Sequence, residues 1–128
     1  MAKGKSTMQN SKVDIRDRTY KYALMVIGLL DILPKESASQ IISKQLIRSA
    51  TSIGANIIEA QACNSKRDFT NYYTHSLKSA NESKFWLKLL RDSGKSKYED
   101  INPILNETIE IANILGACIL TLKGRRNF

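Results

Sequence analysis

Apolar residues recur along this chain three and four positions apart, the spacing that places side chains on one face of an α-helix. Four segments follow this pattern, and none alternates apolar and polar residues as a strand would. The first runs from about Ile15 to Leu33. Pro34 is expected to end it, because the residue before a proline avoids the helical region. The apolar stripe of this helix consists of Ile15, Tyr22, Val26, Leu29 and Leu33.

A second helix is predicted from about Ala38 to Cys63. The preceding Ser37-Ala38-Ser39-Gln40 has the pattern of a capping box, in which side chains satisfy free amide groups of the first turn. Gly54 lies inside this helix and is expected to permit close approach to the small residues Ser76, Ala80 and Ser83 of the third helix. The apolar face of the second helix comprises Ile42, Leu46, Ala50, Ile53, Ile57 and Ala60.

The third helix is predicted from about Lys66 to Ser93. Ser65 is its expected cap, Asp68 is favourable in the first turn, and Gly94 is a natural C-terminal stop. Its core seam has small residues in the middle and comprises Phe69, Tyr73, Ser76, Ala80, Ser83, Leu87 and Leu90.

The fourth helix is predicted from about Asn102 to Leu122. Asp100 or Asn102 would cap it, Pro103 suits the first turn, and Gly124 would stop it. Four helices joined by short connections predict an all-α fold, a single-domain bundle of up-down-up-down topology.

The length of 128 residues fits one domain, and the charge distribution subdivides it. Residues 1–12 carry three lysines and residues 124–128 carry two arginines, in both cases without an acid. These ends are predicted to be basic flexible tails around a bundle domain of residues 13–123. The net charge of +8 and the pI of about 9.6 favour an acidic partner such as nucleic acid, although a basic surface also serves solubility alone.

Targeting and catalytic signals are weak throughout. No apolar run approaches the roughly 20 residues of a membrane span, and Cys63 and Cys118 form no CxxC pair, so we expect a cytoplasmic protein with reduced thiols and no membrane partner.

His75 is the single histidine and no Glu-x-x-His pair accompanies it, which argues against a di-iron site. No nucleophile, base and orienting group form a recognisable set. We therefore expect no enzyme activity, no metal and no cofactor.

Two helices carry more apolar surface than one bundle core needs. The fourth helix is apolar over roughly 240° of its circumference, and the third carries Phe85, Trp86 and Leu89 opposite its core seam. Such surplus usually marks a partner site, which favours self-association, although a wide core would also account for it.

Basic side chains form a stripe on the third helix. Lys84, Lys88, Arg91 and Lys95 are spaced four, three and four residues apart, within an arc of about 60° that contains no acid. They are our candidate residues for binding the phosphates of RNA or DNA. A solvated helix face is the alternative interpretation.

Polar residues line the second helix as well, at Gln45, Arg48, Ser52, Asn56 and Glu59. They form either a solvated face or a hydrogen-bonded network between helices or subunits. Such a network would fix the register of the helices more than it would stabilise them.

Longer segments resemble a known family. Leu46-Ile47-Arg48-Ser49-Ala50-Thr51-Ser52-Ile53-Gly54-Ala55-Asn56-Ile57-Ile58-Glu59-Ala60 resembles the hallmark segment of the bacterial four-helix bundle proteins, also called 23S rRNA intervening-sequence proteins. The later segments 65–69 and 79–90, the second of which contains Phe85-Trp86-Leu87, are also similar to that family. The similarity covers roughly residues 15–122. By motif position, the signature and interface residues are Arg48, Ser52, Asn56, Glu59, Ser79, Glu82, Phe85 and Trp86.

The resemblance implies a left-turning four-helix bundle that assembles as a homopentamer and has no established enzymatic activity or cofactor. It also implies proteins often encoded within intervening sequences of 23S rRNA genes. A related bundle is an accessory protein of diversity-generating retroelements, where it contacts nucleic acid and a reverse transcriptase. The leading hypothesis is thus a homo-oligomeric bundle associated with RNA or DNA. A protein-interaction scaffold without a nucleic-acid role is the alternative.

Overall fold

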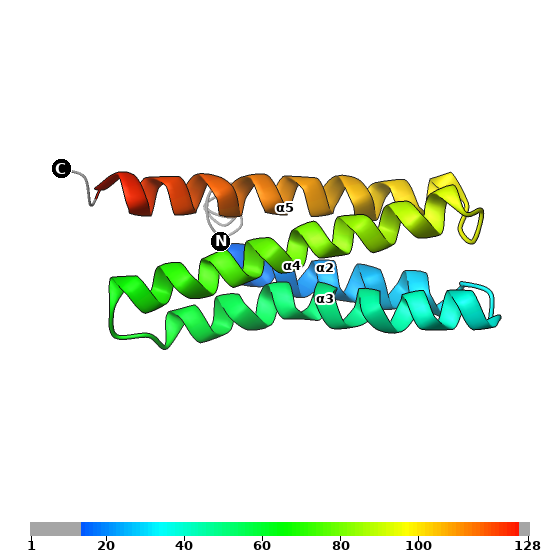
Figure 1. Cartoon of the computed structure of the whole chain (residues 1–128), viewed down its shortest axis with the longest axis horizontal. Helices are drawn as coiled ribbons and strands as arrows, with labels where there is room; N and C mark the ends of the chain where they lie inside the picture. Colours follow the sequence, from blue (N-terminus) through cyan, green and yellow to red (C-terminus); the bar gives the residue numbers. More distant parts are fainter. Residues whose placement is uncertain (1–13, 126–128) are drawn as a thin grey trace, which may run out of the picture.

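The computed structural model describes residues 14–125, and this part of the chain is four α-helices without a strand. The helices lie lengthwise beside one another, and the α2–α3 and α4–α5 connections lie at the opposite end from the α3–α4 connection (Figure 1). The all-α, single-domain prediction is confirmed. The expected N-terminal tail lies outside the described residues. The helices are α2 (Ile15–Asp31), α3 (Ser37–Gln61), α4 (Lys66–Asp92) and α5 (Tyr98–Arg125).

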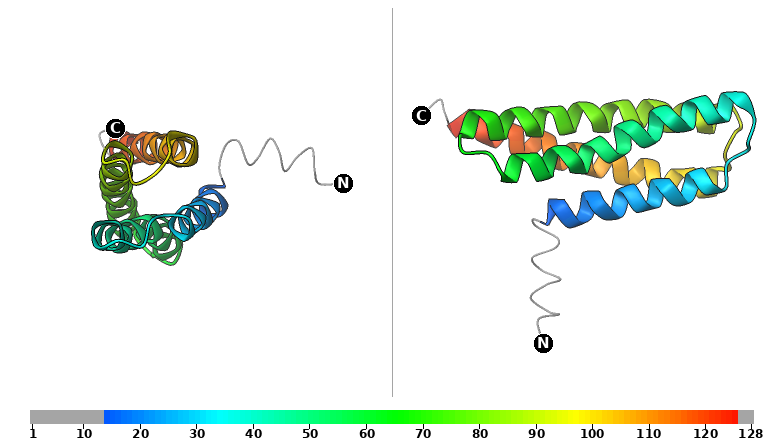
Figure 2. Two further views of the ribbon diagram at one scale, coloured as in Figure 1. Left: turned by 90° about the vertical axis from the view of Figure 1, so that its right-hand side faces the viewer. Right: turned by 90° about the horizontal axis from the view of Figure 1, so that it is seen from below.

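The helices differ in length, and this shapes one end of the molecule. α2 has 17 residues and α5 has 28, a difference of about 16 Å at 1.5 Å per residue. α2 therefore stops short of the end where α5 finishes, as two views show (Figure 1; Figure 2, right). At that end a cavity of about 350 Å³ lies between α4 and α5. Its lining is mainly apolar and includes Phe69, Tyr73, Cys118 and Leu122.

Both ends of α4 follow the sequence prediction. Ser65 caps the start, where its hydroxyl accepts a 3.1 Å hydrogen bond from the Asp68 amide. Gly94 follows the helix with a φ of +77°, a conformation that favours glycine. The amides of Gly94 and Lys95 donate to the carbonyls of Arg91 and Leu90, which completes a Schellman motif and turns the chain sharply towards α5.

The predicted capping box of α3 is wrong. Glu36 occupies the cap position and makes no side-chain cap bond, and Ser37 is already helical. The carboxylate of Glu36 instead accepts a 2.7 Å bond from Lys95 Nζ in the α4–α5 connection. A contact with a distant residue has thus replaced the local cap. Ser39, the third helical residue, is fully buried, and its hydroxyl has no hydrogen-bond partner among residues 14–125.

The start and end of α5 also differ from the prediction. The helix begins at Tyr98 rather than near Asn102, because the amides of Asp100 and Ile101 already bond to the Lys97 carbonyl. Pro103 consequently lies inside the helix, one turn after its start. The helix continues to Arg125, so residues 124 and 125 of the expected tail are helical and residues 126–128 lie outside the described part.

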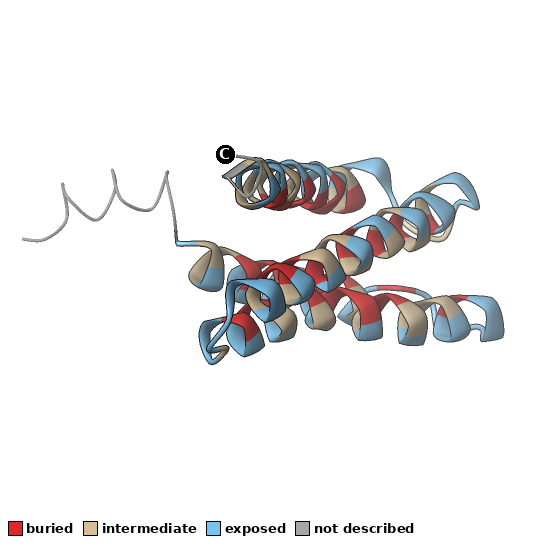
Figure 3. Ribbon diagram, turned by 60° about the vertical axis from the view of Figure 1, so that its left-hand side comes forward, coloured by how far each residue is buried: buried red, intermediate tan, exposed pale blue. Residues whose placement is uncertain are grey.

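The predicted apolar stripes converge on one core. Buried positions form continuous bands on the inward faces of the helices (Figure 3). The first residue of each of the first three stripes is only partly buried, namely Ile15, Ile42 and Phe69. The remaining stripe residues of the first three helices are all buried. α5 contributes Ile101, Ile104, Leu105, Ile111, Ala112, Leu115 and Ile119.

Small polar residues allow α3 and α4 to pack most closely. The Ser49 and Ser83 hydroxyls lie 2.8 Å apart, and the Ser76 hydroxyl donates to the Ile53 carbonyl at 2.8 Å. All three serines are fully buried, so each bond replaces one that water would otherwise make. The small middle of the predicted seam is confirmed, and its hydroxyls connect the two helices.

Gly54 faces a different helix from the one predicted. A Cβ placed on it would lie 3.1 Å from Thr19 Oγ1 of α2 rather than against α4. The Thr19 hydroxyl is itself held by a 2.8 Å bond to the Ile15 carbonyl. Gly54 therefore sets the approach of α2 to α3.

Replacing Gly54 with leucine is expected to lower the free energy of unfolding by about 1–3 kcal/mol, because the added side chain forces α2 away. Gly28 of α2 is the matched control, since a Cβ there meets nothing within 4 Å. Gly28→Leu should raise stability by about 0.5–1 kcal/mol through helix propensity. Urea denaturation of both variants measures the difference. Equal effects at the two positions would contradict the assignment.

By length and composition alone, α5 would suit a membrane. Tyr98–Gly124 is long and apolar enough to cross a bilayer, although polar residues interrupt its apolar runs. The core helix of a soluble protein has the same properties, and the apolar side of α5 packs into the bundle core. The apolar character of α5 is therefore explained in part by burial, and its outward face needs a separate explanation.

Candidate interaction surfaces

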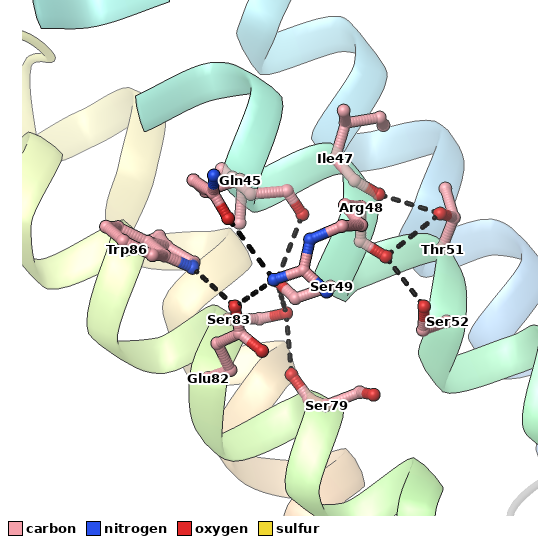
Figure 4. A network of polar contacts seen from close by, with 11 residues as sticks. Gln45, Ile47, Arg48, Ser49, Thr51, Ser52, Ser79, Glu82, Ser83 and Trp86 are labelled. Carbon is pink, nitrogen blue, oxygen red and sulfur yellow. Dashed lines mark hydrogen bonds and ion pairs between the residues drawn. The ribbon is translucent and has the colours of Figure 1, made fainter. Parts of the chain in front are cut away.

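A polar network crosses the outer edge of the α3–α4 pair (Figure 4). Arg48 of α3 donates through Nη2 to Glu82 Oε2 of α4 and, at 3.2 Å, to Gln45 Oε1. Trp86 Nε1 donates to the same Glu82 oxygen at 3.0 Å. One carboxylate therefore connects the two helices and orients the indole ring.

The other predicted signature residues bond within their own helices. The Ser52 hydroxyl donates to the Arg48 carbonyl and the Asn56 amide to the Ser52 carbonyl, both at 2.8 Å. Ser79 contributes its carbonyl, which accepts from the Ser83 hydroxyl at 2.9 Å, and Glu59 is exposed. Within one chain, Arg48 alone of the polar line bonds to another helix, and Gln45 accepts from Arg48 within α3. Ser52 and Asn56 are partly exposed and bond within α3, so for them the two interpretations remain predictions.

The Arg48–Glu82 pair is exposed to solvent, so it is expected to position side chains rather than to hold the fold. Both side chains are more than one third exposed, and such ion pairs contribute at most about 1 kcal/mol. Arg48→Ala should therefore lower the free energy of unfolding by no more than about 1 kcal/mol, as measured by urea denaturation. A loss above about 2 kcal/mol would contradict this prediction. Ala38, exposed in the first turn of the same helix, provides a reference site for the surface substitution Ala38→Ser.

The apolar group predicted on the outer face of α4 divides into two parts. Phe85 is 57% exposed and Leu89 is also exposed. Trp86, however, is only partly exposed and packs against the core cluster, so its placement opposite the seam is wrong. Its ring lies edge-on to Phe85 with centroids 4.9 Å apart. Phe85 is thus an exposed aromatic side chain held by an ordered neighbour.

Two of the four side chains of the basic stripe form ion pairs with carboxylates. Arg91 pairs with Asp92 at 2.8 Å, and Lys95, which lies beyond the end of α4, pairs with Glu36 at 2.7 Å. The prediction that no acid neutralises the stripe is therefore wrong for these two residues. Asp92 adjoins Arg91 in sequence but points to the same side, and Glu36 comes from the α2–α3 connection.

The Arg91–Asp92 pair favours the charged form of both groups. The hydrogen bond raises the pKa of Arg91 and lowers that of Asp92. The guanidinium also lies 6.0 Å from the centre of the Tyr98 ring, within cation–π range. Lys84 and Lys88 form no ion pair within residues 14–125, and Lys88 lies near enough to Asp92 to help lower the pKa of that carboxyl.

A polar connection that the sequence analysis missed joins α2 to α5. Arg18 holds Glu107 through two bonds of 2.7 and 3.0 Å, and the Tyr22 hydroxyl lies 2.7 Å from the Thr108 hydroxyl. The hydrogen bond to Glu107 raises the pKa of Arg18. These partners are nearly ninety residues apart, so no local pattern in the sequence reveals them.

No catalytic arrangement is evident among the described residues. Nowhere in residues 14–125 do three His, Cys, Asp or Glu side chains gather closely enough to hold a metal ion. Burial raises the pKa of the Cys118 thiol, and desolvation also raises that of Cys63, so both favour the unreactive thiol form. His75 is exposed and lies edge-on to Tyr72.

Comparison with known proteins gives a consistent result. Residues 11–117 match the family described as 23S rRNA-intervening sequence protein. The chain is 37% identical to a protein of unknown function from the S23 ribosomal protein family of Bacteroides thetaiotaomicron VPI-5482, whose crystal structure superposes with a TM-score of 0.77. That similarity covers 82% of this chain and 97% of the other. Among curated proteins, none matches significantly.

Proposed function

Since the chain belongs to the 23S rRNA-intervening sequence protein family, we propose that it is a non-enzymatic, cytoplasmic, homo-oligomeric bundle that associates with RNA through a basic surface. The proposed arrangement is an up-down-up-down bundle assembled as a homopentamer, as the family resemblance implies. The chain's own cations support the choice of a polyanionic partner, since the net charge is +8.

The proposal that the protein associates with RNA rests on the two lysines Lys84 and Lys88. These lysines lie four residues apart on α4, and neither has a carboxylate partner in the described range. A repeated copy of this pair on every protomer would give an oligomer a basic belt. Phosphate contacts of this kind would supply affinity without reading bases.

The neutralisation of Arg91 and Lys95 favours the second candidate, a protein-interaction scaffold. Two of the four predicted phosphate ligands are engaged with Asp92 and Glu36, and RNA would have to displace those carboxylates. Exposed Phe85 and Leu89 on the same helix would suit a protein partner.

Salt-dependent RNA binding separates the two candidates. Anisotropy of a labelled single-stranded RNA should show binding at low salt, with log Kd linear in log salt concentration. Lys84→Gln with Lys88→Gln should reduce the slope by about 1.4 per protomer engaged, because each phosphate contact to a single strand contributes about 0.7.

The control changes charge equally at the far end of α4. Lys66→Gln with Arg67→Gln removes two exposed cations from its first turn and should leave more of the slope intact. Absence of RNA binding at low salt would refute the RNA proposal and leave the scaffold. Equal loss in both double variants would show that only net charge matters.

A further inference from the structure

An apolar groove runs between α2 and α3 on the outside of the bundle, with a volume of about 390 Å³. Its walls are apolar and exposed, and its floor is formed by small residues that include Gly54 and Ala55. Arg16 at one end is the single charged residue of the lining. The larger apolar side chains of the walls are Tyr20, Leu24, Ile27 and Ile58, and all four are exposed.

The outward face of α5 exposes apolar side chains between small and polar ones. Ile109, Asn113 and Leu120 follow one another at helical spacing, and Leu120 is 73% exposed. Gly116 and Ala117 lie between the last two. Glu110 beside Ile109 is the one charged residue on this face from Ile109 to Leu120. An exposed helix face of this length with a single charge is unusual for a surface in contact with water alone.

The groove and this face match each other in length. Ile109 to Leu120 spans about 16 Å along a helix, and Arg16 to Ile27 spans the same distance because both pairs are eleven residues apart. Their charges also correspond, with Arg16 at one end of the groove and Glu110 at one end of the face. Aligning the two charges places Leu120 near Ile27.

The two surfaces do not meet within one chain. Both are exposed in the single protomer, and α5 lies across the bundle from α3 in the end-on view (Figure 2, left). A second copy of the chain carries the missing complement of each. We propose that the outward face of α5 of one copy lies in the α2–α3 groove of the next copy, an inference that rests on the proposed self-association.

The proposed contact is heterologous, because a groove on one copy meets a different surface on its neighbour. Such head-to-tail contacts generate closed rings when the rotation between copies closes. A ring with an odd number of subunits requires contacts of this kind, since two-fold contacts pair subunits. The inference therefore supplies the interface that a homopentamer would repeat.

One charge placed in either surface should prevent assembly. Ala55→Arg in the groove and Leu120→Arg on the α5 face alter exposed side chains, so helicity should be retained. Thr51→Arg and Asn113→Arg provide a second variant of each surface. Asn81→Arg, exposed on α4 and belonging to neither surface, is the control. Circular dichroism verifies folding, and size exclusion with light scattering measures mass.

We expect wild type and Asn81→Arg to have a mass several times 14.4 kDa, and each surface variant to fall to the monomer mass. Mixing Ala55→Arg with Leu120→Arg should then give a heterodimer of twice 14.4 kDa, because the intact α5 face of the first fits the intact groove of the second. No ring can form from that pair.

The outcomes distinguish the two levels of the proposal. A wild-type oligomer whose mass the surface variants leave unchanged would overturn the groove assignment and leave self-association standing. Monomeric variants that form no heterodimer on mixing would show a symmetric contact, or an occupant other than a second copy, and also overturn it. A monomeric wild type would refute self-association itself, whereas RNA binding would remain open to its own test.

Discussion

Replacing Tyr22 with alanine is expected to lower the free energy of unfolding by about 3–5 kcal/mol. Tyr22 is among the largest fully buried side chains and lies where α2 meets the rest of the core. Its removal deletes apolar contacts and leaves a cavity that the surrounding helices fill only in part. The Thr108 hydroxyl keeps one bond, to the Ile104 carbonyl, so the loss comes chiefly from packing.

Tyr98 provides the control, since it is the same residue type, is 61% exposed and lies outside the α2–α3 groove. Tyr98→Ala should change stability by no more than about 1 kcal/mol, because it removes only an exposed contact with the Arg91 guanidinium. Urea denaturation monitored by circular dichroism measures both variants. A loss below about 1.5 kcal/mol for Tyr22→Ala would mean that α2 contributes little to the core.

The importance of Tyr22 follows from how α2 is attached. α2 is the shortest of the four helices, and Tyr22–Thr108 and Arg18–Glu107 are polar contacts that join it to α5. The same helix forms one wall of the outer groove. Loss of Tyr22 is therefore expected to disorder the proposed docking surface before it disrupts the closely packed α3–α4 pair.

The helices and the core could be predicted from the sequence because they depend on local periodicity. Tyr22, Ile53 and Leu87 each belong to a stripe that recurs every three or four residues, and all three are buried as expected. Ser65 and Gly94 likewise predict the two ends of α4. Each forms a hydrogen bond with a residue only three positions away in the sequence. The same kind of local signal gave the wrong cap for α3 and the wrong start for α5.

Several errors concern contacts between distant residues, whereas the start of α5 and the Arg91–Asp92 pair are local features that the predictions missed. Glu36 replaces the predicted serine cap because Lys95 folds back onto it. Gly54 meets α2 instead of α4, since periodicity gives the face of a helix but does not say which neighbour lies there. Lys95 is neutralised for the same reason. The spacing of basic residues along one helix does not show which acidic side chains of other segments will lie beside them. Glu36 of the α2–α3 connection is such a residue.

The candidate surfaces illustrate the same division. The surplus apolar character of the fourth helix is a local property, and exposed Ile109 and Leu120 agree with it. The groove that matches them arises only when α2 and α3 pack side by side at Gly54. One half of the proposed interface was therefore visible in the sequence, and the other half required the fold.

Alkaline pH is expected to destabilise the protein through Tyr22. Burial is the main cause that raises the pKa of Tyr22 to about 12, and hydrogen bonds to the hydroxyls of Thr108 and Ser83 only partly oppose it. In the unfolded chain the pKa is about 10. The folded state thus keeps its phenol proton where the unfolded state loses it.

The resulting stability is fully present below about pH 10 and is lost as pH rises towards about 12. A difference of two pKa units corresponds to about 2–3 kcal/mol.

Tyr22→Phe removes this titration and should cost about 1 kcal/mol at neutral pH through the lost hydrogen bond. Because the other tyrosines and the arginines remain, the difference between wild type and Tyr22→Phe isolates Tyr22. Urea denaturation of both proteins from pH 9 to 12 should show wild type losing its advantage and then becoming the less stable of the two. Parallel pH profiles would show that Tyr22 ionises equally in both states.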